Sequence, residues 1–258
     1  MTLPLLRPDW PVPPGVLAAM STRAGGVSSG PWQSLNLGVA VGDVPAAVAD
    51  NRARFVAALA AEPVWLRQVH GVNVRRLIET SAAGPDEPAD AAWTTAKGVA
   101  CTVQAADCLP VLFAARDGSA VAAAHAGWRG LAAGVLESTL RSLQQGAGVQ
   151  PAEVQVWLGP CIGPRQFEVG ADVLQGFGVA AVPVGQMADQ PLFKPCTRRD
   201  GSPGWLADLQ GLAAWRLHTA GVLHVSRLQR CTVEEPSTFF SFRRDGVTGR
   251  MAASVWRS

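Results

Sequence analysis

Three short segments of the chain combine a side chain that could bind a metal or act as a nucleophile with residues that form turns. They are Gln68-Val69-His70-Gly71, Ala106-Asp107-Cys108-Leu109-Pro110 and His125-Ala126-Gly127-Trp128-Arg129-Gly130. Two imidazoles and a thiolate suit a borderline-soft ion, and three protein ligands with one open position are typical of catalytic zinc. No paired-ligand motif such as C-x-x-C is present, so plainer interpretations stay open: a cysteine packed as a small apolar group, and histidines making ordinary hydrogen bonds.

The elements around these segments must bring them together if they form one site. Apolar runs flank each segment, and Asp117-Gly118 predicts a hairpin between the run after Cys108 and the run that ends at His125. This hairpin would make Cys108 and His125 neighbours in space. We expect strands at 17–22, 64–67, 72–78, 99–104, 109–115, 120–125, 154–158 and 251–256, helices at 45–60, 129–145 and 206–220, and loops at 24–38 and 81–89.

The order of these elements indicates the fold class. Strands outnumber helices and several are linked by hairpins, which favours an α+β arrangement of mixed sheets covered by helices over a doubly wound parallel sheet. The length of 258 residues suits a single domain, 1–258. Neither a G-x-G-x-x-G motif after a strand nor a Walker loop is present, so the nucleotide cofactors that such motifs bind are not indicated.

Composition narrows the classes of function. Hydrophobic residues make up 48% of the chain and charged residues 16%, which is typical of a globular protein, and a net charge of +2 gives no reason to expect nucleic acid as a partner. No stretch of about 18 continuous apolar residues predicts a membrane span. The first residues do not resemble a secretory signal, and five cysteines without close pairs indicate reduced thiols, so we expect a cytoplasmic protein.

Six motifs carry a resemblance to a known family. They are STRAGGVSSGPWQSLNLG, QVHG, ADCLPVLF, HAGWRG, LGPCIGPRQFEVG and SFRRDGVTGRMAA, and the match runs from about Ser21 to Trp256. Together they resemble the multicopper polyphenol oxidase, or laccase-domain, family, whose bacterial members are also named peptidoglycan editing factor or YfiH-like. The resemblance implies a layered α/β/β/α fold related to cysteine-hydrolase toxins. It also implies that His70, Cys108 and His125 bind one zinc ion per chain.

The resemblance further implies an enzyme of purine nucleosides. Such an enzyme would phosphorolyse adenosine, inosine and methylthioadenosine to the free base plus ribose 1-phosphate or its 5-methylthio analogue. It would also deaminate adenosine to inosine. The oxidase name fits the residues poorly, because a laccase needs several imidazoles for each copper and the chain has four histidines. Two of these, His218 and His224, lie in or just after a predicted helix, where a surface or packing role is expected.

Helper residues for these reactions are less clear from the sequence. Zinc deaminases usually carry a glutamate close after a ligand histidine, but Ala126 and Gly127 follow His125 here. Asp107 is therefore our candidate proton carrier, unless it caps a turn. Phosphorolysis needs a phosphate site, for which Arg23, Ser28, Arg52 and Arg129 are candidates, and Asn36 could bind the ribose or base; each of these residues could instead serve folding.

A second hypothesis is a metal-free cysteine hydrolase or amidase that edits peptidoglycan precursors. Cys108 would be the nucleophile and His125 the base. A binding protein without catalysis is a third. Copper could replace zinc, because sites with nitrogen and sulfur ligands bind Cu2+ more tightly. We expect small-molecule partners, namely purine nucleosides and phosphate, and a monomer or weak homodimer.

Overall fold

Two mixed β-sheets form the centre of the protein in a computed structural model that describes residues 3–79, 87–180, 191–198 and 200–258. In order, the five-stranded sheet contains β1 (Leu5–Leu6), β2 (Val16–Ser21), β14 (Met251–Arg257), β6 (Val99–Ala105) and β3 (Glu62–Trp65). The six-stranded sheet contains β13 (His224–Arg227), β9 (Val154–Leu158), β7 (Leu109–Ala115), β8 (Val121–Ala126), β5 (Ala91–Thr94) and β4 (Val74–Leu77). Both sheets combine parallel and antiparallel pairs.

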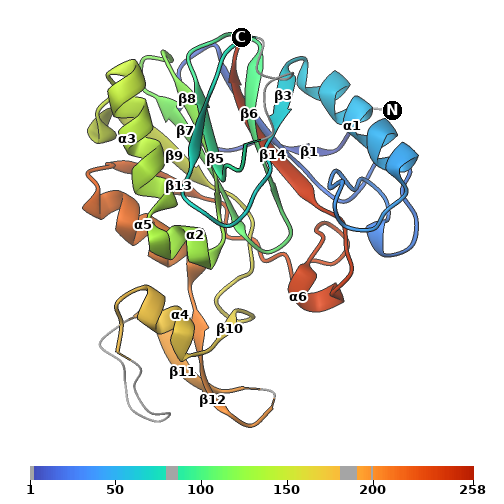
Figure 1. The fold of residues 1–258 in the computed structure, drawn as a ribbon, viewed down its shortest axis with the longest axis vertical. Helices are drawn as coiled ribbons and strands as arrows, with labels where there is room; N and C mark the ends of the chain where they lie inside the picture. Colours follow the sequence, from blue (N-terminus) through green and yellow to red (C-terminus); the bar gives the residue numbers. More distant parts are fainter. Residues whose placement is uncertain (1–2, 80–86, 181–190, 199) are drawn as a thin grey trace.

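Helices cover the outer face of each sheet. Helix α1 (Pro45–Leu59) lies beside the five-stranded sheet, and α2 (Trp128–Ala133), α3 (Val135–Ala147) and α5 (Leu209–Thr219) lie beside the six-stranded sheet (Figure 1). Side chains alternate between the faces of a strand. Accordingly Val111 and Phe113 of β7 join the core beneath α3 and α5, whereas Leu112 and Ala114 join the core between the sheets. A further core contains Phe55 of α1, so the predicted α/β/β/α layering is confirmed.

A smaller unit that the sequence did not predict projects from one end of these layers. It consists of a three-stranded sheet, β10 (Glu168–Val169), β12 (Pro203–Ala207) and β11 (Phe193–Thr197), together with α4 (Ala171–Gly176) (Figure 1). A short helix, α6 (Phe242–Asp245), precedes β14. In the part of the chain that the structure describes, none of the helices is both long and apolar enough to cross a bilayer.

Two predicted helices differ from the structure. The expected helix 129–145 is wrong as a single element, because Gly134 adopts a left-handed conformation (φ 101°) that ends α2 and begins α3. The expected helix 206–220 begins later, since Pro203–Ala207 forms strand β12. Helix α5 starts after Asp208, whose carboxylate accepts a hydrogen bond of 2.8 Å from the Gly211 N–H.

The predicted hairpin around Asp117-Gly118 is confirmed. Gly118 adopts a positive φ of 74° and its N–H donates to the Ala115 carbonyl over 2.9 Å. Strands β7 and β8 pair antiparallel with Pro110 opposite His125. This register brings Cys108, which precedes β7, to the same end of the hairpin as His125. The predicted loop 81–89 lies mostly outside the described residues.

Candidate functional site

His70, Cys108 and His125 meet at one end of the two sheets. One ligand atom from each residue lies within 4.8 Å of the others, and this is the one such group of His, Cys and carboxylate side chains found among the described residues. The Cys108 Sγ lies 3.7 Å from the His70 Nε2. Two such ligands on one tetrahedral zinc ion would be about 3.6 Å apart, given ordinary Zn–N and Zn–S bond lengths. The donor set and this distance both fit a zinc ion.

The turn that carries His70 is anchored at both ends. Gln68 makes two hydrogen bonds with Gln104 of β6, of 2.8 and 2.7 Å. His70 itself has a left-handed backbone, with φ 61°, which is unfavourable for a residue with a side chain. Further hydrogen bonds from this turn must therefore hold His70 in place, and they go to Asp90.

Asp90 is a buried carboxylate that the sequence analysis did not select. One oxygen, Oδ2, accepts from the N–H groups of Val69 (3.1 Å) and Gly71 (2.7 Å). The other, Oδ1, accepts from the His70 N–H (2.9 Å) and the His125 Nδ1 (2.8 Å). A carboxylate that binds one ring nitrogen of a histidine directs the other nitrogen toward the metal. Asp90 thus positions two of the three candidate ligands, His70 and His125.

Glycines in the HAGWRG segment make room for the cluster. A Cβ atom on Gly127 would lie 2.8 Å from the His70 ring and 3.0 Å from the Cys108 Sγ. A Cβ on Gly130 would lie 2.9 Å from the Gly71 carbonyl. All three distances are too short for a side chain without displacement of the neighbours. These glycines allow helix α2 to begin directly against the ligands.

The electrostatics of the cluster favour a thiolate. Burial of Cys108 opposes its ionisation, but the charge of His125 and hydrogen bonds from both histidines outweigh burial and lower its pKa to about 6. Burial would likewise lower the pKa of His125, yet the Cys108 thiolate and the Asp90 carboxylate raise it to about 9. A thiolate beside two imidazoles is the form of cysteine that binds metals and acts as a nucleophile.

With this geometry established, comparison with known proteins decides the family. Residues 17–258 match the family model described as multi-copper polyphenol oxidoreductase laccase. The chain belongs to this laccase family. One relative is the Pseudomonas aeruginosa protein named purine nucleoside phosphorylase PA4543, which is 49% identical over 97% of each chain. Another is the Escherichia coli protein named purine nucleoside phosphorylase YfiH, which is 47% identical over 98% of each chain.

Solved structures of laccase-family relatives share the fold. A Neisseria meningitidis protein superimposes with a TM-score of 0.87 at 44% identity, covering 98% of this chain and 99% of that one. YlmD from Geobacillus stearothermophilus superimposes with a TM-score of 0.83 at 30% identity, covering 99% of each chain.

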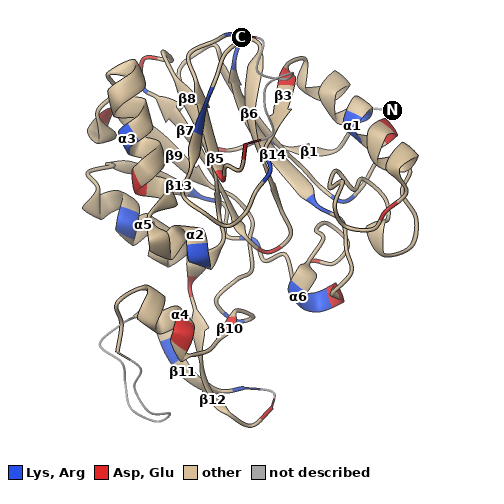
Figure 2. Ribbon diagram, in the orientation of Figure 1, with Lys and Arg blue, Asp and Glu red and all other residues tan. Residues whose placement is uncertain are grey.

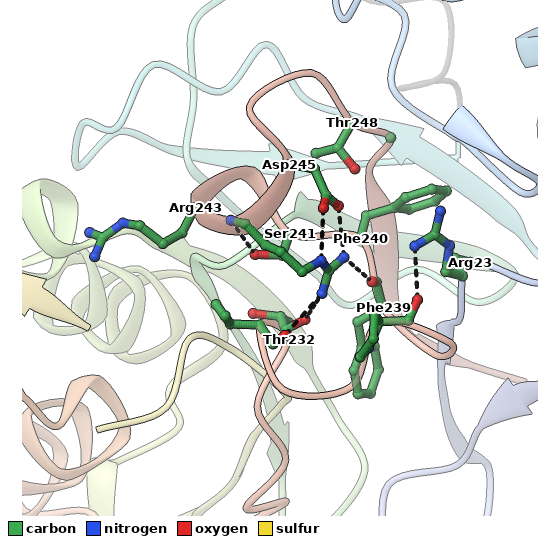
Figure 3. A network of polar contacts seen from close by, with 12 residues as sticks. Arg23, Thr232, Phe239, Phe240, Ser241, Arg243, Asp245 and Thr248 are labelled. Atoms are coloured by element: carbon green, nitrogen blue, oxygen red, sulfur yellow. Dashed lines mark hydrogen bonds and ion pairs between the residues drawn. The ribbon is translucent and has the colours of Figure 1, made fainter. Parts of the chain in front are cut away.

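Asp107 of this laccase-family chain is held on both carboxylate oxygens. Its Oδ1 accepts from the Thr232 hydroxyl and its Oδ2 from the Arg243 N–H, each over 2.6 Å. Its backbone is left-handed, with φ 95°, and its carbonyl accepts from the Ile162 N–H. Figure 3 shows Thr232 and Arg243 within the polar network around α6. These contacts fit the turn-stabilising interpretation of Asp107, and each oxygen retains a second acceptor position.

Asn36 and Ser28 lie in a buried network that fastens the loop 24–38 to α1. The Asn36 amide donates to Gly38 O (3.1 Å) and Asp43 Oδ2 (2.9 Å), and it accepts from the N–H groups of Gly38 and Arg250 (2.9 Å each). Ser28 donates to Asp43 over 2.6 Å and accepts from Asn51 over 2.9 Å. Both donors of the Asn36 amide are therefore used within the protein.

The predicted phosphate-binding arginines are dispersed. Arg23 donates to the Gln33 and Pro236 carbonyls. Its guanidinium lies over the Phe240 ring, and Figure 3 shows the two residues next to each other. Arg52 donates to the Leu37 carbonyl and stacks on Trp65, and burial lowers its pKa to about 10. Arg129 is exposed on α2 and lies over the Trp128 ring. Of these three, Arg129 is on the element that adjoins the ligand cluster.

A cavity of about 400 Å3 lies next to the site without including any of its three ligands. Its lining contains Cys161 and Ile162, and the Ile162 N–H is the group that donates to the Asp107 carbonyl. The lining also contains two arginine–glutamate pairs, Arg165–Glu234 and Arg230–Glu235. Cys161 is buried and its pKa is raised well above the usual value by that burial. This thiol is therefore unsuited to nucleophilic chemistry.

Proposed function

We propose that this protein is a zinc-dependent purine nucleoside enzyme. It would phosphorolyse adenosine, inosine and methylthioadenosine, and deaminate adenosine to inosine. The main support for this proposal is the cluster of His70, Cys108 and His125, in which one potential ligand atom of each residue lies within 4.8 Å of the others. It occurs in a chain 47–49% identical to proteins named purine nucleoside phosphorylase.

Zinc would be held by the two imidazoles and the thiolate. When bound, it would supply a Lewis acid that favours ionisation of water and stabilises negative charge. The residues of the chain would do the rest: Asp90 holds a proton on the His125 Nδ1, which leaves the Nε2 free for the metal.

Asp107 is our candidate for proton transfer. Its carboxylate oxygens are fixed by Thr232 and Arg243, so a proton held there would have a defined position. In phosphorolysis a phosphate oxygen bonds to the ribose C1′ as the bond from C1′ to the purine nitrogen breaks. The electron pair leaves with the purine, and the hydrogen of HPO4 2− ends on that nitrogen. Asp107 could relay this hydrogen.

Two measurements test the proposal. Metal analysis of purified protein should give about one zinc per chain, and less than a tenth of that after Cys108→Ala. Incubation with adenosine and phosphate should release adenine, and inosine should form by deamination. Full zinc retention in the Cys108→Ala variant would refute the ligand set, and the absence of both products would refute the activity.

A cysteine hydrolase or amidase remains the second candidate, because one observation favours it. The thiolate of Cys108, the raised pKa of His125 and the carboxylate of Asp90 form a cysteine–histidine–aspartate arrangement. Chelation separates the two candidates. Activity on an amide substrate that survives complete zinc removal but is lost on thiol alkylation would select the hydrolase.

We do not propose polyphenol oxidation, although the family description contains the word laccase. His218 of α5 bonds to the Val222 carbonyl, and His224 is exposed on β13. The cluster therefore has two imidazoles, whereas a laccase needs several for each copper.

A further inference from the structure

One arginine near the ligand cluster has contacts unlike those of its neighbours. The Nη1 of Arg250 donates to the Thr248 and Gly249 carbonyls, each over 3.0 Å, while its Nε and Nη2 make no hydrogen bond to any of the described residues. Nor does any carboxylate in the described ranges form an ion pair with it. By contrast, Arg244 of α6 forms an ion pair of 2.7 Å with Asp245. Figure 2 shows blue and red segments next to each other on this helix.

Strand register places Arg250 beside the site. In the pairing of β14 with β6, Met251 lies opposite Ala105. Arg250 precedes Met251, so the antiparallel ladder brings it next to Ala106, at the start of the Asp107–Cys108 turn. The charges of Asp107 and Cys108 act on the Arg250 guanidinium, raising its pKa against the larger lowering by burial. The Arg250 guanidinium is therefore within electrostatic range of the Asp107 and Cys108 side chains.

The loop 24–38 contacts both the backbone and the aliphatic part of the side chain of Arg250. The Arg250 N–H donates to the Asn36 amide oxygen over 2.9 Å. Gly38 leaves room for the side chain, because a Cβ there would lie 2.7 Å from the Arg250 Cγ. The guanidinium itself lies 5.9 Å from the ring of Phe242, which is 58% exposed, so its end of the side chain is near the surface.

These contacts leave a fixed guanidinium edge beside the ligand cluster, and none of the described carboxylates forms an ion pair with it. A guanidinium offers paired donors that match two oxygens of a phosphate. We propose that Arg250 is the anchor for inorganic phosphate, the co-substrate of phosphorolysis, and that Asn36 and Gly38 position it. This inference rests on the proposed function and assigns its phosphate site to a residue other than the arginines expected from the sequence.

Arg250→Met tests the assignment with two kinds of readout. In the wild type, 50 mM inorganic phosphate should raise the melting temperature measurably, and the variant should lose most of this shift. The KM for phosphate should rise roughly 10- to 100-fold, as expected when one charge-assisted contact is lost. The KM for the nucleoside and the rate of adenosine deamination, which consumes no phosphate, should change less than about threefold. Arg250→Lys should fall between the two.

Arg54→Met provides the matched control, since Arg54 is an exposed arginine of α1 paired with Asp50. It should leave the KM for phosphate unchanged. If Arg250→Met lowers phosphorolysis and deamination equally, together with the melting temperature in the absence of phosphate, the role is structural and the assignment is overturned. An unchanged KM for phosphate would also overturn it. A wild type that shows no phosphate-dependent release of base would instead refute the proposed function.

Discussion

At the scale of single residues, Asp90 accepts more hydrogen bonds within the site than any of the three candidate ligands makes. It joins three consecutive backbone N–H groups of the His70 turn to the ring of His125. The pKa of Asp90 is lowered, because these hydrogen bonds and the charge of His125 together outweigh its burial. A left-handed His70 and a correctly oriented His125 therefore depend on one carboxylate.

Replacing that carboxylate should weaken metal binding. In Asp90→Asn, the amide NH2 would face at least one of the donors that Asp90 accepts from, so the His70 turn and the His125 ring would both shift. We expect zinc affinity to fall roughly 10- to 100-fold, as is usual when a carboxylate behind a ligand histidine is lost. Competition with a chromophoric chelator measures this, and Asp50→Asn on the surface of α1 is the control. Equal affinities for Asp90→Asn and the wild type would contradict the positioning role.

Gly127→Ala should damage the cluster by crowding. The new methyl group would lie 2.8 Å from the His70 ring and 3.0 Å from the Cys108 Sγ, so at least one ligand must move. Zinc affinity should fall at least about tenfold. The absorption of a cobalt-substituted protein, which reports thiolate ligation, should change as well. Gly98→Ala strains the backbone, because Gly98 has a φ of 73°, but its added Cβ meets no atom within 4 Å. It therefore controls for a loss of stability without crowding of the cluster.

The metal-free protein should show a pH-dependent thiol. Because the pKa of Cys108 is lowered to about 6, the reactive thiolate predominates above that pH and disappears as the pH falls below it. Alkylation of Cys108 after zinc removal should be half-maximal near pH 6. Cys101, whose burial raises its pKa above the usual range, should stay unlabelled in the folded protein. Peptide mapping measures the labelling of both cysteines. An alkylation rate of Cys108 with its inflection near the ordinary thiol pKa of about 8.5 would contradict an ion pair between the Cys108 thiolate and His125.

At the scale of elements, the ligands sit where strands end and turns begin. His125 is the penultimate residue of β8, Cys108 precedes β7, and His70 lies between β3 and β4. The β7–β8 hairpin sets two of these positions by its register. Helix α2 then begins beside the cluster and must stop at Gly134, so that α3 can cover the six-stranded sheet.

Gly134→Ala should therefore destabilise the protein through its backbone. The φ of 101° is unfavourable for alanine, although a Cβ there would meet no atom closer than 3.5 Å. We expect the free energy of unfolding to fall by about 1–2 kcal/mol. Gly134→Asn should cost less, because asparagine tolerates positive φ better. Urea unfolding measures the difference, and equal stabilities of the alanine variant and the wild type would show that the helices can merge.

At the scale of the whole molecule, two of the three proposed ligands lie on connections between the sheets. The chain passes from β3 of the five-stranded sheet to β4 of the six-stranded sheet through His70, and from β6 to β7 through Cys108. His125 belongs to the six-stranded sheet alone. A metal ion bound to all three would therefore link the β3–β4 and β6–β7 connections to the end of β8.

Metal removal should lower global stability as a consequence. A ligand that binds only the folded state stabilises it by about 4 kcal/mol at a concentration a thousand times its dissociation constant. The melting temperature of the zinc-loaded protein should fall by several degrees on chelation and recover when zinc is added. Cys108→Ala should melt at a temperature that zinc does not change. An unaltered melting temperature of the wild type on chelation would argue against the metal as a link between the crossings.

The sequence predicted the layers and the candidate ligand set through the motifs that carry the family resemblance, and the structure confirms the layers. Alternating apolar runs specify strands, since each such run buries one or both faces, and the Asp117-Gly118 turn specifies which runs pair. Prediction of the elements from the sequence failed at left-handed positions and in short polar strands. Gly134 breaks a pattern that continues on both sides, and Pro203–Ala207 has no alternation strong enough to separate it from the helix that follows.

The groups that surround the candidate ligands become apparent in the three-dimensional structure alone. Asp90 precedes an apolar strand and carries no motif of its own, yet the approach of β5 to β8 brings its carboxylate to His125. Arg250 reaches the site because β14 pairs with β6, from which it is separated by more than half of the chain. Hydrogen bonds between distant segments have no local signal in a sequence, because their partners are chosen by the packing of whole sheets.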